Sequence, residues 1–173
     1  MKAVDLDIPA ALDNLEAMLR HEIERRNLND PLIIGIHTGG AWIAERLHQR
    51  LNLESPLGLL DISFYRDDFS QIGMHPKVKP SRLPPTIEGR DVVLVDDVLF
   101  TGRTIRAALN EIFDYGRPNR VILAVLIERD GRQIPIQADC IGATIELHRG
   151  QRIKLTGPDP LGILIQNVGT QAA

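Results

Sequence analysis

Residues 92–104 read VVLVDDVLFTGRT, a pattern from which the architecture of the whole chain can be worked out. The four apolar residues 92–95 are typical of a strand buried in a parallel sheet. Asp96 and Asp97 come next, and the run Thr-Gly-Arg-Thr leads into residues 105–112, whose apolar positions recur at helical spacing. Strand, loop and helix in this order predict part of a βαβ unit.

Similar patterns flank this segment on both sides. Further strands are predicted at residues 32–36, 57–64, 121–127 and 140–142, and a terminal hairpin at 153–155 and 161–165. Apolar residues at helical spacing predict helices around residues 12–23 and 43–51. Alternating strands and helices favour an α/β fold with a central, mostly parallel sheet and helices on both faces. In such sheets ligands bind beyond the carboxyl ends of the strands.

The bulk composition is that of an ordinary globular protein. We expect residues 1–173 to form one domain, because the chain has 173 residues, 43% hydrophobic and 25% charged. The first five residues do not resemble a secretory signal, no apolar run is long enough to cross a membrane, and Cys140 is the lone cysteine, so we expect a cytoplasmic protein. A net charge of −3 argues against sequence-independent binding to nucleic acids.

The two acids and the helix start predict a binding site for a sugar phosphate. Neighbouring buried carboxylates repel each other, and hydrogen bonds from a ribose diol and a hydrated Mg²⁺ nearby would relieve that cost. The start of a helix binds phosphate through free backbone N–H groups and the helix dipole. Thr101, Gly102, Arg103 and Thr104 lie at this start. We therefore expect diol and phosphate groups to bind one short loop apart.

Two other loops carry chemistry. Residues 37–40 read HTGG between a strand and a helix, and Gly39 and Gly40 predict an anion-binding turn of exposed N–H groups. Residues 65–85 are polar, rich in proline and aperiodic, which is typical of a lid or binding loop. The five histidines show no metal-ligand spacing.

Residues 92–104 resemble the signature that binds 5-phosphoribosyl-1-pyrophosphate (PRPP) in type I phosphoribosyltransferases. More narrowly, the chain resembles the PyrR family, uracil phosphoribosyltransferases that also regulate pyrimidine genes. Further similar segments are IGIHTGG at 34–40, FYRDD at 64–68, YGRP at 115–118 and PIQADCIG at 135–142. The resemblance implies the type I phosphoribosyltransferase fold, with residues 65–85 as a flexible hood loop over PRPP.

The resemblance also implies roles for single residues. Asp96 and Asp97 would bind the ribose hydroxyls and, through water, Mg²⁺, while residues 101–104 bind the 5-phosphate. Thr38, Gly39 and Gly40 would bind pyrophosphate, although relatives commonly have Lys and Arg where this chain has His37 and Gly39. Arg66 would assist catalysis from the hood loop.

The implied base pocket contains Phe100, Cys140 and Ile141. Relatives usually carry an aromatic residue at position 140, and Cys140 can also be interpreted as a buried apolar residue. Purine phosphoribosyltransferases have an acid at position 100, so Phe100 favours a pyrimidine. The implied reaction joins uracil and PRPP to give UMP and pyrophosphate, with Mg²⁺ as cofactor.

Three alternatives stay open at this stage. PyrR proteins also bind leader mRNA of pyrimidine operons in response to UMP, and Arg129 and Arg132 are the candidate RNA-binding residues here. Gly131 and Gln137 stand where relatives carry His and Arg, which weakens the case for RNA binding. A regulator with little catalysis is the second alternative. A purine phosphoribosyltransferase is the third hypothesis. By analogy with relatives, we expect a homo-oligomer.

Overall fold

The computed structural model describes residues 6–62 and 81–168. Along the chain the elements are α1 (Ile8–Arg25), β1 (Leu32–Ile36), α2 (Gly39–Leu51), β2 (Gly58–Leu60), β3 (Asp91–Leu99), α3 (Arg103–Tyr115), β4 (Arg120–Arg129), β5 (Cys140–Ile145), β6 (Gln151–Thr156) and β7 (Gly162–Asn167). Strands β1 to β5 make one sheet, and β6 and β7 make a separate hairpin.

The five-stranded sheet has the order β2-β1-β3-β4-β5, and all of its neighbouring strands run parallel. The central strand β3 pairs with β1 only as far as Gly35 opposite Val95. On its other side it stays paired with β4 as far as Leu99 opposite Glu128. The end of β3 therefore extends beyond β1, which exposes one edge of this strand next to the start of α2.

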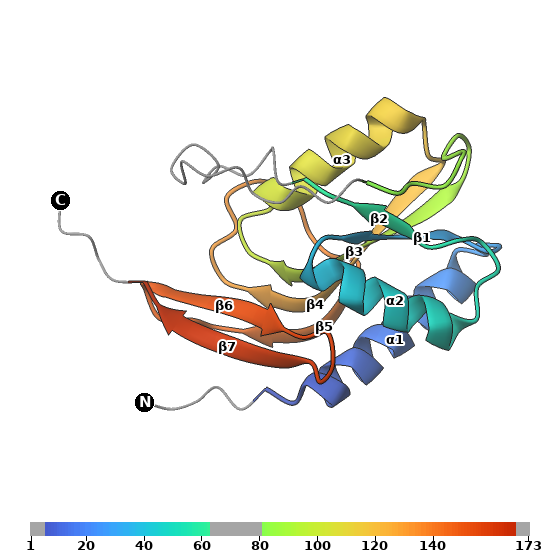
Figure 1. The fold of residues 1–173 in the computed structure, drawn as a ribbon. Helices are drawn as coiled ribbons and strands as arrows, with labels where there is room; N and C mark the ends of the chain where they lie inside the picture. Colours follow the sequence, from blue (N-terminus) through green and yellow to red (C-terminus); the bar gives the residue numbers. More distant parts are fainter. Residues whose placement is uncertain (1–5, 63–80, 169–173) are drawn as a thin grey trace.

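Helices cover both faces of the sheet, which confirms the predicted fold class. Figure 1 shows α3 on one face and α1 and α2 on the other. Buried residues accordingly form two apolar clusters, one containing Leu15 and Ile43 from α1 and α2, the other containing Ile105 and Ile112 from α3. Successive apolar side chains of β1 lie in opposite clusters, as expected for a strand covered on both sides.

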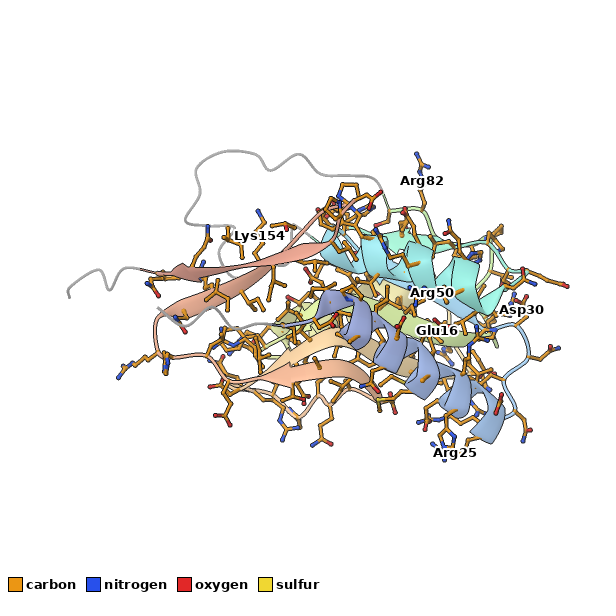
Figure 2. All side chains as sticks on the ribbon, turned by 90° about the horizontal axis from the view of Figure 1, so that it is seen from below. Glu16, Arg25, Asp30, Arg50, Arg82 and Lys154 are labelled. Atoms are coloured by element: carbon orange, nitrogen blue, oxygen red, sulfur yellow. The ribbon has the colours of Figure 1, made fainter. Side chains whose placement is uncertain are left out.

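Ion pairs and caps fix the helices beneath the sheet. Asp7 caps α1 by accepting a hydrogen bond from the Ala10 N–H at 2.9 Å. Arg50 of α2 lies 3.0 Å from Glu16 of α1, and Figure 2 shows these two side chains next to each other. Because this ion pair lies near the surface, it orients the two helices more than it stabilises the fold.

The hairpin of β6 and β7 lies at the carboxyl end of the sheet, as Figure 1 shows. Leu155 is its buried residue and packs into the cluster below the sheet. The turn after β6 is tied to α2, since Arg46 donates a hydrogen bond to the Pro158 carbonyl at 2.6 Å. The predicted terminal hairpin is thus confirmed.

Several strand boundaries differ from the sequence prediction, and three of them bear on the site. The predicted strand 92–95 extends from Asp91 to Leu99, so Asp96 and Asp97 belong to the strand itself. Strand β5 continues to Ile145, three residues beyond the predicted 140–142. Strand β2 covers only Gly58–Leu60 of the predicted 57–64, and residues 63–80 lie outside the described part.

The described part of the hood loop contacts the sheet edge. Arg82 and Leu59 exchange backbone hydrogen bonds of 2.7 and 2.8 Å. Arg66 and the rest of residues 65–80 lie outside the described residues.

Across the described residues, none of the helices combines the length and the apolar character needed to span a bilayer.

Candidate active site

The two acids lie at the carboxyl end of β3, each fixed by the next backbone N–H. Asp96 is 4% exposed and accepts a hydrogen bond from the Asp97 N–H at 2.9 Å. Asp97 is half-buried and accepts one from the Val98 N–H, also at 2.9 Å. Each of these contacts occupies one carboxylate oxygen, Oδ1 in both residues. The backbone therefore orients both carboxylates before any ligand binds.

The glycine turn predicted for pyrophosphate packs directly against these acids. A Cβ atom on Gly39 would overlap Oδ2 of Asp97 and lie 2.6 Å from its Cγ. A Cβ atom on Gly40 would lie 2.7 Å from the Val95 carbonyl oxygen and 2.9 Å from the Asp96 Cα. Only glycine permits this approach, which places the first turn of α2 against the end of β3.

Thr38 precedes this turn as the N-cap residue of α2, and its side chain makes no capping hydrogen bond. It is exposed, whereas Gly39 and Gly40 are buried. The positive end of the α2 dipole thus faces the side of the sheet that carries Asp96 and Asp97. That arrangement suits the binding of an anion at the start of α2. A cation would then bind between this anion and the two acids.

The predicted phosphate cradle opens α3. Gly102 is the N-cap residue, with a left-handed φ of +92°. The Thr101 hydroxyl accepts a hydrogen bond from the Arg103 N–H at 3.2 Å, and the Arg103 side chain donates to the Gln133 side chain at 3.1 Å. The start of this helix and the two acids are joined by the short segment Val98–Phe100 at one edge of the sheet, as the sequence predicted.

A cavity of about 490 Å³ opens beside the cradle. Its lining comes from the carboxyl ends of β3, β4 and β5 and the loop after β4: Leu99, Phe100, Glu128, Arg129, Asp130, Gly131, Arg132, Gln137, Ala138, Ile141, Thr144, Ile145 and Glu146. The loop is bound to the cradle, because the Thr101 carbonyl accepts hydrogen bonds from the N–H groups of Gln133 and Ile134 at 3.0 and 3.3 Å. Base and phosphate subsites would therefore share one wall.

Two of the three predicted base-pocket residues line this cavity. Phe100 is 42% exposed there, and Ile141 contributes its side chain. The Ile141 carbonyl points to α1, where it accepts a hydrogen bond from the Asn14 side chain at 3.3 Å. Ile141 therefore offers the cavity an apolar side chain rather than its backbone oxygen.

Cys140 is not among the residues that line this cavity, and its interpretation as a buried apolar residue is confirmed. Its side chain is fully buried in the cluster beneath α1. Burial raises the pKa of its thiol to about 12, and the nearby carboxylates of Glu22 and Asp139 add to the shift. The physical reason is strand alternation, which turns neighbours 140 and 141 to opposite faces of β5.

Several cavity residues were missed by the sequence interpretation, among them Gly131, Thr144 and Glu146. Thr144 and Glu146 lie at the end of β5, four and six residues after the predicted strand begins, and Gly131 follows β4. The carboxyl ends of parallel strands form one edge, so correct strand boundaries would have identified these residues.

The candidate RNA-binding arginines differ in their surroundings. Arg132 is exposed at the cavity rim. The Arg129 side chain is only 10% exposed, and its guanidinium carbon lies 3.9 Å from the centre of the Phe100 ring. Arg129 is thus part of the cavity wall rather than an open cation.

Comparison with known proteins connects this geometry to a family. The family model described as "Phosphoribosyl transferase domain" matches residues 6–153. The "Bifunctional protein PyrR" of Nitrosococcus oceani is 54% identical over 167 residues, which cover 95% of this chain and 94% of the relative. The protein of that name from Pseudomonas putida is 51% identical, over 97% and 99% of the two chains.

The chain belongs to the PyrR family of phosphoribosyltransferases. Its reaction class is therefore the transfer of a pentosyl group, as predicted. This PyrR-family chain matches its relatives over nearly their full length, so the site described above lies within the shared region.

Solved structures support the fold of this PyrR-family chain. A hypoxanthine phosphoribosyltransferase from Staphylococcus aureus superimposes with a TM-score of 0.64 at 22% identity, covering 84% of this chain and 78% of that chain. A hypoxanthine-guanine phosphoribosyltransferase from Bacillus anthracis gives a TM-score of 0.66 at 16% identity, with 88% and 87% covered. At such identities the likeness concerns the fold alone.

Proposed function

We propose that this PyrR-family chain transfers the phosphoribosyl group of PRPP to uracil, giving UMP and pyrophosphate. The observation that carries the proposal is the packing of Gly39 and Gly40 against Asp96 and Asp97, one short segment before the cradle at residues 101–104. A pyrophosphate, a ribose and a 5-phosphate would thus bind in the order in which they occur in PRPP.

The carboxylates of Asp96 and Asp97 accept hydrogen bonds from the ribose 2- and 3-hydroxyls in this proposal. Oδ2 of Asp97 faces the glycine turn, where water molecules of a hydrated Mg²⁺ would meet it. When bound, Mg²⁺ would neutralise charge on PRPP and on the leaving pyrophosphate. Among the described residues no cluster of three or more ligand side chains offers a full metal cage, which fits a hydrated ion shared with the substrate.

Positioning supplies most of the catalysis in this proposal. The cradle and the glycine turn hold both ends of PRPP, so the sugar carbon that reacts is placed between the turn and the base cavity. The N–H groups of the turn stabilise the charge that develops on pyrophosphate as the bond to the sugar breaks. Arg66 adds a positive charge from the hood loop, in keeping with the family resemblance. We place the reaction in the cytoplasm.

The base preference is tested by assaying uracil, hypoxanthine, guanine and adenine in parallel with PRPP and Mg²⁺. We expect nucleotide formation with uracil and at least about 100-fold lower kcat/KM with each purine, because a site that pairs with one base edge leaves polar groups unpaired with another. Phe100 supplies no proton-exchanging group to a purine ring. Equal or faster reaction with a purine would replace this assignment by the purine alternative.

A second activity is proposed from the word "bifunctional" in the relatives' name. We infer that UMP-dependent binding to leader mRNA of a pyrimidine operon is that activity. The exposed side chain of Arg132 supports it, while Arg129 is occupied in the cavity wall. A homo-oligomer would present several such surfaces to one RNA.

RNA binding is measured by gel-shift titration with the leader upstream of the host's pyrimidine genes. We expect a shift at micromolar protein that strengthens with UMP and weakens in Arg132→Ala, because each lost cation removes a phosphate contact. Arg149→Ala, which removes an exposed cation from the turn before β6, serves as the control. Absence of any shift at micromolar protein would remove the regulatory activity and leave the enzyme.

A further inference from the structure

Phe100 is contacted by Arg129, the last residue of β4, and by Gly131 in the loop that follows. The guanidinium carbon of Arg129 lies 3.9 Å from the ring centre, over the face of the ring. Gly131 approaches so closely that a Cβ atom there would lie 2.5 Å from Cε2 of the ring. Gly131 also has a φ of +109°, which side chains other than glycine rarely adopt. The ring position therefore depends on both residues.

Arg129 is itself fixed over the ring. Its Nη1 donates a hydrogen bond to the Gln151 carbonyl at the start of β6, at 3.0 Å, and its Nε donates to the Asp130 carbonyl at 3.2 Å. The side chain is 10% exposed. A cation–π contact is stronger when the cation is shielded from water, and these two backbone acceptors hold the guanidinium plane in place.

The three residues share one location in the active site. Phe100, Arg129 and Gly131 all line the cavity of about 490 Å³ that Ile141 also lines, and Phe100 directly precedes the phosphate cradle. Phe100 is 42% exposed, so its ring is not buried by packing alone and needs support to keep one orientation. Without Arg129 and Gly131 the ring would be free to turn into the cavity or toward solvent.

We propose that Arg129 and Gly131 are positioning residues that clamp Phe100 as a wall of the nucleobase cavity. The clamp determines how well the base binds, while the PRPP subsite, whose cradle follows Phe100 in the chain, is unaffected. This inference rests on the proposed function of the cavity as the base subsite. It also assigns Arg129 to the enzyme reaction and leaves Arg132 as the open cation of this loop.

The test compares Arg129→Met with Arg149→Met, a matched change at an exposed arginine that does not line the cavity. In Arg129→Met we expect the KM for uracil to rise about five- to twentyfold, the fold-change of one shielded cation–π contact. The KM for PRPP should stay near that of the unchanged protein, while the melting temperature falls by about 2–4 °C for each kcal/mol lost with the same contact. Arg149→Met should leave both KM values unchanged. Equal KM values for uracil in the two variants would overturn the clamp.

A second comparison asks whether Arg129 acts through the ring. In a Phe100→Leu background the ring is absent, so adding Arg129→Met should not raise the KM for uracil further. Fully multiplicative effects of the two changes would show that Arg129 acts on the base independently, and the clamp would be wrong. If Arg129→Met fails to fold, Gly131→Ala displaces the ring from the other direction, and the same rise in the KM for uracil is expected.

A spectroscopic measurement separates failure of the clamp from failure of the proposed function. In protein labelled with ¹³C-phenylalanine, the ring signals of Phe100, assigned with Phe100→Leu, should shift or broaden in Arg129→Met and stay in place in Arg149→Met. Ring signals unaffected by Arg129→Met would refute the clamp, whatever the enzyme does. An enzyme that makes no UMP but shows the ring effect would refute the proposed function and retain the clamp.

Discussion

Asp97→Asn is expected to lower kcat/KM for UMP formation by about 100-fold or more, the usual effect of removing one charge-stabilising group from an active site. The amide has nearly the shape of the carboxylate, and its oxygen can still accept the Val98 N–H that Asp97 accepts at 2.9 Å. What it loses is the negative charge toward the glycine turn, where ribose hydroxyls and water on Mg²⁺ would bind. The measurement is steady-state kinetics with uracil and PRPP, together with the melting temperature.

Asp91→Asn is the matched control, because Asp91 lies at the opposite end of the same strand. It pairs with Arg120 at 3.0 Å on the surface, a contact that contributes about 1 kcal/mol or less to stability. This control should keep its activity within about twofold, since surface substitutions away from a site rarely exceed about 0.5 kcal/mol. An Asp97→Asn protein as active as the control would disprove the role of the acid pair.

Gly39→Ala and Gly40→Ala are expected to fail in different ways, although they are neighbours. The new methyl group at position 40 meets backbone, the Val95 oxygen at 2.7 Å and the Asp96 Cα at 2.9 Å, so α2 must move away from β3. Overpacking of this kind costs about 1–3 kcal/mol. The methyl group at position 39 instead meets the Asp97 side chain, whose carboxylate can rotate away and whose Cβ, at 2.9 Å, needs only a small shift. We therefore expect Gly40→Ala to lose stability and Gly39→Ala chiefly to lose activity.

Chemical denaturation and kinetics measured on both variants distinguish the two outcomes. Gly39→Ala should unfold near the unchanged protein but lose about tenfold or more in kcat/KM, because a displaced carboxylate no longer meets its ligand. Gly40→Ala should unfold at a clearly lower denaturant concentration. If Gly39→Ala is fully active, the contact between turn and acid does not matter for catalysis.

Much of the fold could be predicted from patterns within single elements. The apolar run before Asp96 predicted β3, and the helical spacing after Thr104 predicted α3. The alternation of strands and helices along the chain predicted a parallel sheet. Strand ends were predicted less well, because pairing with β4 continues β3 through both acids to Leu99. Such pairing depends on a strand that lies far along the chain, so no local pattern could show it.

The lining of the base cavity also depends on contacts between segments that are distant in the chain. Phe100 and Ile141, two of the implied base-pocket residues, line it, whereas for Cys140 the interpretation as a buried apolar residue is the one confirmed. Side chains alternate along β5, so only one of the neighbours Cys140 and Ile141 can face the cavity. Which of them faces the cavity depends on the side of the sheet that α1 covers. Arg129 was a candidate RNA-binding residue by family resemblance, and no pattern in the sequence indicated its contact with Phe100.

The order of residues alone specified a strand, a pair of acids and a glycine-containing helix start, because these features depend on neighbours in the chain. It thereby specified the family and the chemistry of a sugar phosphate. Three-dimensional packing alone placed Gly39 against Asp97, turned Cys140 into the core and set Arg129 over Phe100. Those relations join segments distant in sequence, and they arise when a parallel sheet brings the carboxyl ends of its strands to one edge.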